Sequence, residues 1–436
     1  MNAHYDDDAL IALLDTPDDP HIAECADCRA SFEEYQAVTS SLGDNSVWNF
    51  RPLNEEPNRQ TIANLQSFAS AMRAEDEAAT PLVAELLAGP REEWMPRLLA
   101  NEKYRTAGVV RALMEASDKA IDVMPPDALE ISALATEIAD KLDPKMYPSD
   151  TVMKLRGNAW RDRGYCLYRC SHFAESTRAL NVSNQILSEV VVADYDIARL
   201  GIARAVLERS FESFRSASRI AERSVSTFRS HGDTNRMVSA ALASAQAKWK
   251  SGSSHEALND LLALSALDAV DADTQSRLFI TVAAIHRDLG DEEAAITYFT
   301  QARFANGDSN CNELLIQWSI AILLSRVGAG DQAEKALLQL SKSFEALGLY
   351  SEAVQVGLNL AELYLQSGRH SSVEVVCRRA IDFYTRGGLS MTERVLTAFG
   401  YLHESARQRR TTPATVREVR RFLSGEAIVL ALPPSS

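Results

Sequence analysis

The sequence predicts an all-α protein in which a small N-terminal helical unit precedes a right-handed α-solenoid. Only 7% of the 436 residues are aromatic, with 19 glycines and 14 prolines, and Ala, Leu, Glu, Arg and Ser dominate. This composition favours helices over sheets. Helical patterning also runs almost without interruption from about residue 60 to residue 424, and a short phrase recurs in it about every 40 residues.

Charge and composition exclude several classes of protein. The formal charge of −15 would repel a phosphate backbone, so no nucleic-acid partner is expected. No stretch reaches about 18 consecutive apolar residues, and the start, MNAHYDDDAL, is acidic where a signal peptide is basic and then apolar. We therefore expect a soluble, cytoplasmic protein without membrane contact. Six scattered cysteines do not form a disulfide framework.

Residues 1–40 have their own pattern and are predicted to form a separate unit. DDDALIALLD suits a short helix, TPDDP ends it, and a second helix is expected to run through the cysteines to about Val38. Residues 41–60 have no helical period and are predicted to be a linker. Within it, Trp48 and Phe50 are candidate partner-binding residues, or else they pin the linker to its own protein.

The most informative motif of this unit is HIAECADC, with His21, Cys25 and Cys28 spaced H-x3-C-x2-C. On one helix, positions i and i+4 share a face, so the three side chains can converge. Imidazole and thiolate ligands suit Zn(II), which takes a fourth ligand in tetrahedral geometry. His4 is the candidate fourth ligand, and the aspartates at positions 6–8 are fallbacks.

Three interpretations of this motif stay open. The first is a structural zinc site that folds a unit too small to be stable alone. The second is a redox-responsive site in which Cys25 and Cys28 oxidise and release the metal. The third is a helix with two incidental cysteines. A further trio, Cys166, Cys170 and His172, is either a second metal cluster or a set of small side chains at a helix end.

The recurring phrase predicts stacked helical hairpins over residues 149–424, after a capping region of helices at 61–148 and before a tail at 425–436. Glycines at 252, 290, 328 and 368 each precede a small residue by five positions. Glycine suits a left-handed turn between the two helices, and a small residue lets them approach closely. Degenerate copies occur around Ser171 and Phe211. One hairpin cannot bury its apolar face alone, whereas stacked hairpins can.

The phrase resembles the tetratricopeptide repeat. In LAELYLQSGRHSSVEVVCRRA, Ala361, Tyr364, Gly368 and Ala380 match the repeat's small, Gly/Tyr and Ala positions. The resemblance implies about six or seven hairpins with a concave surface that binds proteins. Because the chain is acidic, that surface is expected to prefer basic or helical partners.

The segment ARQRRTTPATVREVRRFL follows the last clear repeat. In one interpretation its arginines, with Arg409 and Arg410 as candidate partner-binding residues, form a docking patch for an acidic partner. Alternatively, Val416 and Val419 belong to the apolar face of a final helix that caps the solenoid and turns its charged face to water.

The N-terminal motif resembles the zinc-binding domain of anti-sigma factors, in which an H-x3-C-x2-C helix follows a helix that carries another ligand. His21, Cys25 and Cys28 match the motif, and His4 takes the upstream position. Together with the repeats, this resemblance implies a bacterial regulator of transcription whose zinc domain binds a sigma factor and whose array binds a signalling partner.

No catalytic constellation is visible. GAGD at 328–331 lacks the Lys-Ser or Lys-Thr of a phosphate loop, and no G-x-S-x-G occurs. We therefore expect a protein-binding regulator and not an enzyme. One alternative is a repeat scaffold or sensor that presents a partner to a protease or effector in a bacterial stress or defence system. The other is an enzyme with a dispersed active site.

Overall fold

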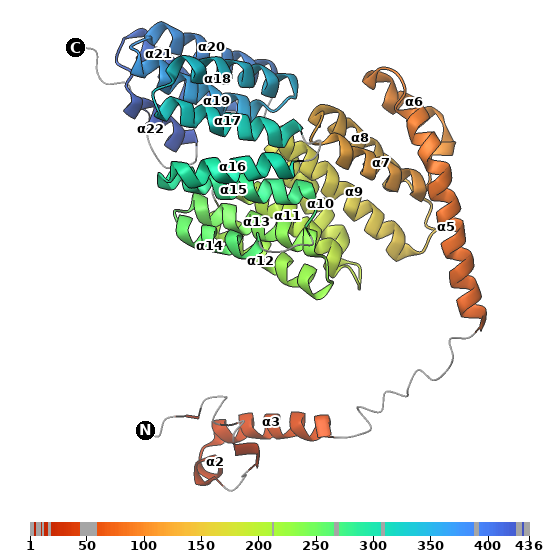
Figure 1. Ribbon diagram of the computed structural model, residues 1–436. Coiled ribbons are helices and arrows are strands. Elements are labelled where there is room, and N and C mark those ends of the chain that lie inside the picture. The colour runs from red at the N-terminus through yellow and green to blue at the C-terminus, as the bar shows by residue number, and fades with distance from the viewer. Residues whose placement is uncertain are drawn as a thin grey trace. The chain divides into compact units, whose positions relative to one another are not determined.

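The structure is a computed structural model in which every regular element of the described residues is a helix (Figure 1). It describes residues 4–5, 10, 13–15, 19–43, 59–211, 213–265, 270–306, 310–387, 392–423 and 430. This confirms the all-α prediction. No described helix is both long and apolar enough to cross a membrane. The chain divides into two compact units, Met1–Arg73 and Ala74–Ser436.

The first unit is built from short helices around a small core. Its elements are η1 (Leu13–Asp15), α2 (Pro20–Glu24), α3 (Ala26–Gly43) and the beginning of α5 (Arg59–Leu86). Within the described residues, its buried core consists of Leu10, Ile22, Cys28 and Phe32. So few apolar side chains supply little folding free energy, and units of this size commonly depend on a metal or disulfides. Trp48 and Phe50 lie outside the described residues.

Short helices precede the array in the second unit. They are η2 (Arg91–Glu93), α6 (Trp94–Ala100), η3 (Glu102–Tyr104), α7 (Ala107–Ala120) and α8 (Pro125–Ala139). At Gly108 an added Cβ would lie 2.7 Å from the backbone oxygen of Glu75, so glycine allows α7 to approach α5 closely. The Glu75 carboxylate accepts the N–H of Gly108 at 2.6 Å. Helix α8 packs against the first helix of the array.

Seven helical hairpins follow within the described residues, and they confirm the predicted tetratricopeptide-like array. Their helices are α9 (Ser149–Arg169), α10 (Phe173–Ser188), α11 (Asp194–Ser210), α12 (Phe214–Ser230), α13 (Thr234–Lys250), α14 (Ser254–Leu264), α15 (Ala272–Leu289), α16 (Glu292–Ala305), α17 (Asn310–Arg326), α18 (Gly330–Ala346), α19 (Tyr350–Gln366), α20 (His370–Gly387), α21 (Thr392–Arg407) and α22 (Pro413–Leu423). The first helices of successive hairpins, α9 to α19 in odd numbers and called here the inner helices, also contact one another. Ala257, Ala295 and Ala333, each five residues after a turn glycine, are fully buried at the hairpin contacts.

The turns inside the hairpins adopt the left-handed conformation that the glycines predict. The φ angles of Gly252, Gly290, Gly328 and Gly368 are 96°, 85°, 84° and 69°. Two further hairpins keep this conformation without glycine, at Ser171 (φ 64°) and Arg409 (φ 56°). Left-handed backbone is unfavourable for residues with a Cβ. Backbone hydrogen bonds close both turns: His172 N–H donates to Leu167 O at 2.8 Å, and Arg410 N–H donates to Ser405 O at 2.9 Å.

Replacing Gly290 by alanine will destabilise the array by about 1 kcal/mol, because its left-handed φ disfavours a Cβ. No heavy atom lies within 4 Å of the added carbon, so the backbone alone causes the loss. Gly400 is the matched control, since it lies inside α21 with equally open space and no positive φ. Gly400→Ala will stabilise by about 0.5–1 kcal/mol. Urea denaturation followed by circular dichroism will measure the free energy of unfolding of both variants. A change of the same sign in both variants would contradict this account.

Hairpins far apart in the sequence also touch, through what we call the closing contact. The Oγ atoms of Ser171 and Ser351 lie 2.7 Å apart, and the Arg169 guanidinium donates to Cys311 Sγ at 3.2 Å. The turn after α9 therefore meets the start of α19. In a simple solenoid each repeat touches only its neighbours, and this array departs from that rule.

Candidate functional site

The first candidate site is a cluster of three metal-ligating side chains in the N-terminal unit. His4 Nδ1, Cys25 Sγ and Cys28 Sγ lie within 4.8 Å of one another. The nitrogen is 3.4 Å from Cys25 Sγ and 3.6 Å from Cys28 Sγ. In a tetrahedral zinc site, ligands at about 2.0 and 2.3 Å from the metal are about 3.6 Å apart. The three side chains therefore already have the spacing of zinc ligands.

The backbone at Cys25 places its thiol. The prediction of one helix through both cysteines is wrong, because Cys25 is extended (φ −101°, ψ 112°) and separates α2 from α3. The break leaves few backbone groups unsatisfied, since the Cys25 N–H donates to His21 O at 2.8 Å and Arg29 N–H donates to Cys25 O at 3.0 Å. The backbone N–H of Cys28 donates to the Cys25 thiol and lowers its pKa. A lowered pKa favours the thiolate, which is the form that binds metal.

Tyr5 holds His4 over the cysteines. Its hydroxyl donates to the Asp19 carboxylate at 3.3 Å, and its ring lies 4.5 Å from the ring of His21. Its backbone N–H donates to Cys28 Sγ and lowers the pKa of that thiol, but burial and the neighbouring Cys25 outweigh this and raise the pKa overall. The short segment before the first helix is thereby fixed to the start of α3.

His21, the remaining predicted ligand, is not among the three side chains that converge. Its Nε2 atom is nevertheless buried and has no hydrogen-bond partner among the described residues. A buried imidazole nitrogen without a partner needs an explanation, and a metal ion is one that fits this neighbourhood. The donor set of one imidazole, two thiols and this unpaired nitrogen fits zinc, and His21 stays a predicted ligand.

The second cysteine group is not a metal cluster in the part of the chain that the structure describes. Cys166 and Cys170 are 2% and 7% exposed, and burial raises the pKa of each thiol to about 12. The interpretation as small core side chains therefore holds, and His172 does not join them. Cys311 and Cys377 are also buried.

The second candidate site, called here the inner groove, is a cavity of about 950 Å³ lined by the inner helices and α22. Aromatic and amide side chains line part of it: Phe214, Trp249, Trp318, Gln355, Asn359 and Gln366. The indole of Trp318 donates to Asn359 Oδ1 at 3.2 Å, which orients both groups. Such a lining can contact apolar side chains and hydrogen-bond a peptide backbone.

The charge of the inner groove is opposite to that of the chain. Its basic lining residues are Arg209, Lys250, Arg287, Arg326, Arg417, Arg420 and Arg421, against the two carboxylates Asp288 and Glu362. The expectation that an acidic array prefers basic partners is therefore wrong for this surface. Net charge is a sum over the whole molecule, and nearly all of the 60 Asp and Glu residues lie elsewhere.

The sequence contains a signal for this groove in the positions of its basic residues. Arg209, Lys250, Arg287 and Arg326 each fall within the last three residues of an inner helix, namely α11, α13, α15 and α17. A basic residue just before each turn also complements the negative end of the helix dipole. Repetition at one position of successive repeats predicts a charged stripe, because stacking places that position in a row.

The C-terminal arginines divide between two roles. Arg409 occupies the exposed left-handed turn before α22, and Arg410 follows it, and neither lines the inner groove. Arg417 and Arg420 of α22 do line it, while Val419 on the same helix is fully buried against the array. Helix α22 thus caps the array and also contributes cations to the groove.

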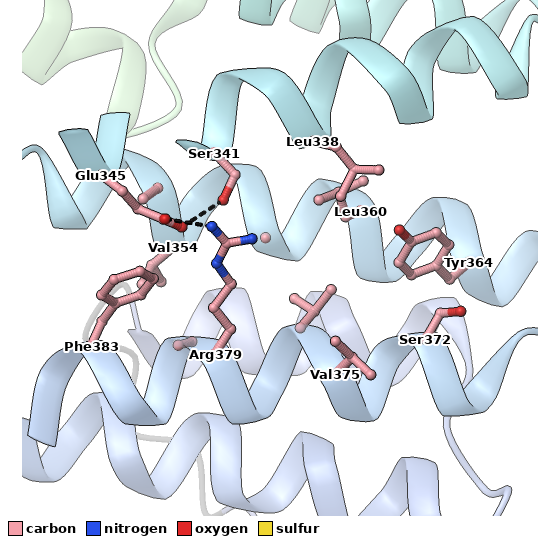
Figure 2. A pocket seen from close by; sticks show the side chains of 14 residues that line it. Leu338, Ser341, Glu345, Val354, Leu360, Tyr364, Ser372, Val375, Arg379 and Phe383 are labelled. Atoms are coloured by element: carbon pink, nitrogen blue, oxygen red, sulfur yellow. Dashed lines mark hydrogen bonds and ion pairs between the residues drawn. The ribbon is translucent and has the colours of Figure 1, made fainter. Parts of the chain in front are cut away.

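A smaller cavity of about 180 Å³ lies between α18, α19 and α20 (Figure 2). Figure 2 shows Arg379 and Ser341 both bonded to Glu345, at 2.5 and 3.0 Å. Val375, 62% exposed, lines the same cavity. Since the ion pair bridges neighbouring helices, this crevice belongs to the packing between repeats.

No known protein family matches the chain, and no curated protein matches its sequence. Several solved structures are similar, among them the following three. A Rap protein complexed with the Competence and Sporulation Factor is 13% identical (TM-score 0.45; 81% of this chain, 100% of that chain). The apo quorum sensor NprR from B. thuringiensis is 13% identical, with a TM-score of 0.44 over 77% of this chain and 99% of that chain. Aspartyl phosphate phosphatase F from Bacillus subtilis is 12% identical, with a TM-score of 0.45 over 100% of both chains. These values lie below the level at which a shared function follows.

Proposed function

We propose that the chain is a non-enzymatic regulator that binds two protein partners, one through a zinc-folded N-terminal unit and one through the array. The observation that carries this proposal is the convergence of His4, Cys25 and Cys28 in a unit with a very small core. Bound zinc would supply folding free energy to that unit. The side chains present would hold the ion, bury Cys28 and fix α3 as a docking surface.

The proposed partner of the zinc unit is a sigma factor. Its support is the H-x3-C-x2-C resemblance at His21, Cys25 and Cys28, together with the position of His4 beside both thiols. In this proposal the unit regulates transcription by holding the sigma factor away from polymerase. The array, with its large inner groove, takes the signalling partner.

Co-expression of the full chain with tagged sigma factors from the source cell tests this function. We expect one sigma factor to co-purify with the wild type and to be lost in Cys25→Ser/Cys28→Ser. The control is Lys250→Gln/Arg417→Gln/Arg421→Gln, which changes the inner groove and should retain the sigma factor. If no sigma factor is retained by the wild type, while the array still binds an unrelated protein, the regulator is a scaffold of another kind and the proposal is wrong.

A further inference from the structure

We infer that the inner groove binds an acidic, extended segment of the partner protein, in which carboxylates alternate with apolar side chains. The inference deepens the proposed function, and it rests on that function for the role of the array as a second binding surface.

The positive charge extends beyond the inner groove. A second cavity of about 230 Å³ on the same inner helices is lined by Arg161, Arg199, Arg236 and Arg277, against Asp118 and Asp162. Arg209 of the inner groove donates to Gln246, which lines this second cavity, so the two adjoin. The two cavities together present eleven cations and four carboxylates to one surface. A ligand of opposite charge is therefore strongly favoured.

Several of these cations are poorly compensated within the chain. No described carboxylate lies within ion-pair distance of Lys250, whose ammonium sits 4.0 Å from the centre of the Trp249 ring. Shielding from water lowers the pKa of Lys250; Asp288 offsets part of this effect, and repulsion from Arg287 and Arg209 lowers the pKa further. Arg199 shows the same effect, since burial and Arg161 lower its pKa to about 10. A carboxylate entering here would relieve repulsion as well as form ion pairs.

The non-charged lining favours a protein segment over a nucleic acid. Trp249 and Trp318 offer apolar surface, and the amides of Gln355 and Asn359 offer donors and acceptors for a peptide backbone. Asp288 and Glu362 lie among the cations and would repel a continuous phosphate backbone. The carboxylates of a peptide can be spaced so that they avoid Asp288 and Glu362, whereas a nucleic acid carries a phosphate at every nucleotide and cannot avoid them.

Fluorescence anisotropy with the full-length protein tests the inference. The probe is a fluorescein-labelled peptide of alternating Glu and Leu, compared with a peptide of alternating Gln and Leu and with labelled oligodeoxythymidylate. We expect the Glu peptide to bind at least about tenfold more tightly than either comparison probe. Its affinity should fall as NaCl rises from about 50 to about 300 mM, because salt screens the charges.

Two triple variants make the result specific to the groove. Lys250→Gln/Arg417→Gln/Arg421→Gln should raise the Kd for the Glu peptide by at least about tenfold. Lys119→Gln/Arg178→Gln/Arg407→Gln removes the same charge from side chains that are 73%, 70% and 66% exposed and lie outside both cavities. This control should leave the Kd unchanged within about twofold.

Three outcomes would overturn the inference: equal weakening by both triple variants, tighter binding of the oligonucleotide, or no preference for the Glu peptide. Its failure is separable from failure of the proposed function. A wild type that retains a sigma factor but does not bind the peptide contradicts the groove inference alone. Peptide binding without sigma-factor retention supports the groove inference and contradicts the proposed function of the zinc unit.

Discussion

Replacing Cys25 and Cys28 together by serine will reduce the zinc content from one ion per chain to none and unfold the N-terminal unit. Both thiols contact His4 Nδ1, and the buried core of this unit has four side chains among the described residues, with Cys28 as one of them. Structural zinc contributes about 10–16 kcal/mol of binding free energy at neutral pH, far more than a core of this size supplies. Elemental analysis will measure the zinc, and limited proteolysis will report cleavage confined to the first unit.

Cys170→Ser is the control for this experiment, because it removes a buried array thiol from the other cysteine group. The zinc content should stay at one ion per chain. Zinc that persists in Cys25→Ser/Cys28→Ser, or that falls in Cys170→Ser, would place the metal elsewhere and refute the assignment. His21→Ala adds a finer test, since weaker zinc binding in that variant would identify His21 as the fourth ligand.

Phe344→Ala will destabilise the array by about 3–5 kcal/mol. Phe344 on α18 is fully buried, and its ring meets Trp318 edge-on at 5.9 Å, so the substitution removes both apolar burial and an aromatic contact. Phe304 on α16 is the matched control, because the same change at a side chain 85% exposed should cost less than about 0.5 kcal/mol.

Guanidinium denaturation followed by circular dichroism and by tryptophan fluorescence will compare the two variants. Trp318, one of the five tryptophans, contributes a fluorescence signal from the site of substitution, while the helical signal reports on the whole array. A loss at Phe304 as large as that at Phe344 would show that the burial of Phe344 against Trp318 is not what stabilises this part of the chain.

The turns show how far sequence patterns predict this fold. Gly252 and Gly290 mark left-handed positions because glycine is the residue that adopts them without strain. Ser171 and Arg409 adopt the same conformation without being glycine, and no local pattern reveals that. The sequence offers Arg409 as a docking residue without revealing that it lies in a repeat turn, and its role in docking stays a prediction.

The two candidate sites differ in the same way. Spacing alone brings Cys25 and Cys28 together, yet it could not predict that an extended Cys25 would divide the helix, because hydrogen bonds on both sides compensate for the break. The sign of the charge in the inner groove depends on which helix faces line it. The total charge of the chain contains no such information. The basic residues at Lys250 and Arg287 become informative only once the stacking of the repeats is known.

The closing contact changes how the array responds to a bound molecule. In an open solenoid, strain at one hairpin decays within its neighbours, and the ends can fray separately. Here Ser171 contacts Ser351, and Arg169 donates to Cys311. These two contacts join hairpins that are far apart in the sequence. An array that is closed in this way shares strain, because spreading it at one hairpin also strains the closing contact. A ligand that spread the inner helices on entering the groove would therefore strain the closing contact, although the ligand itself does not touch it.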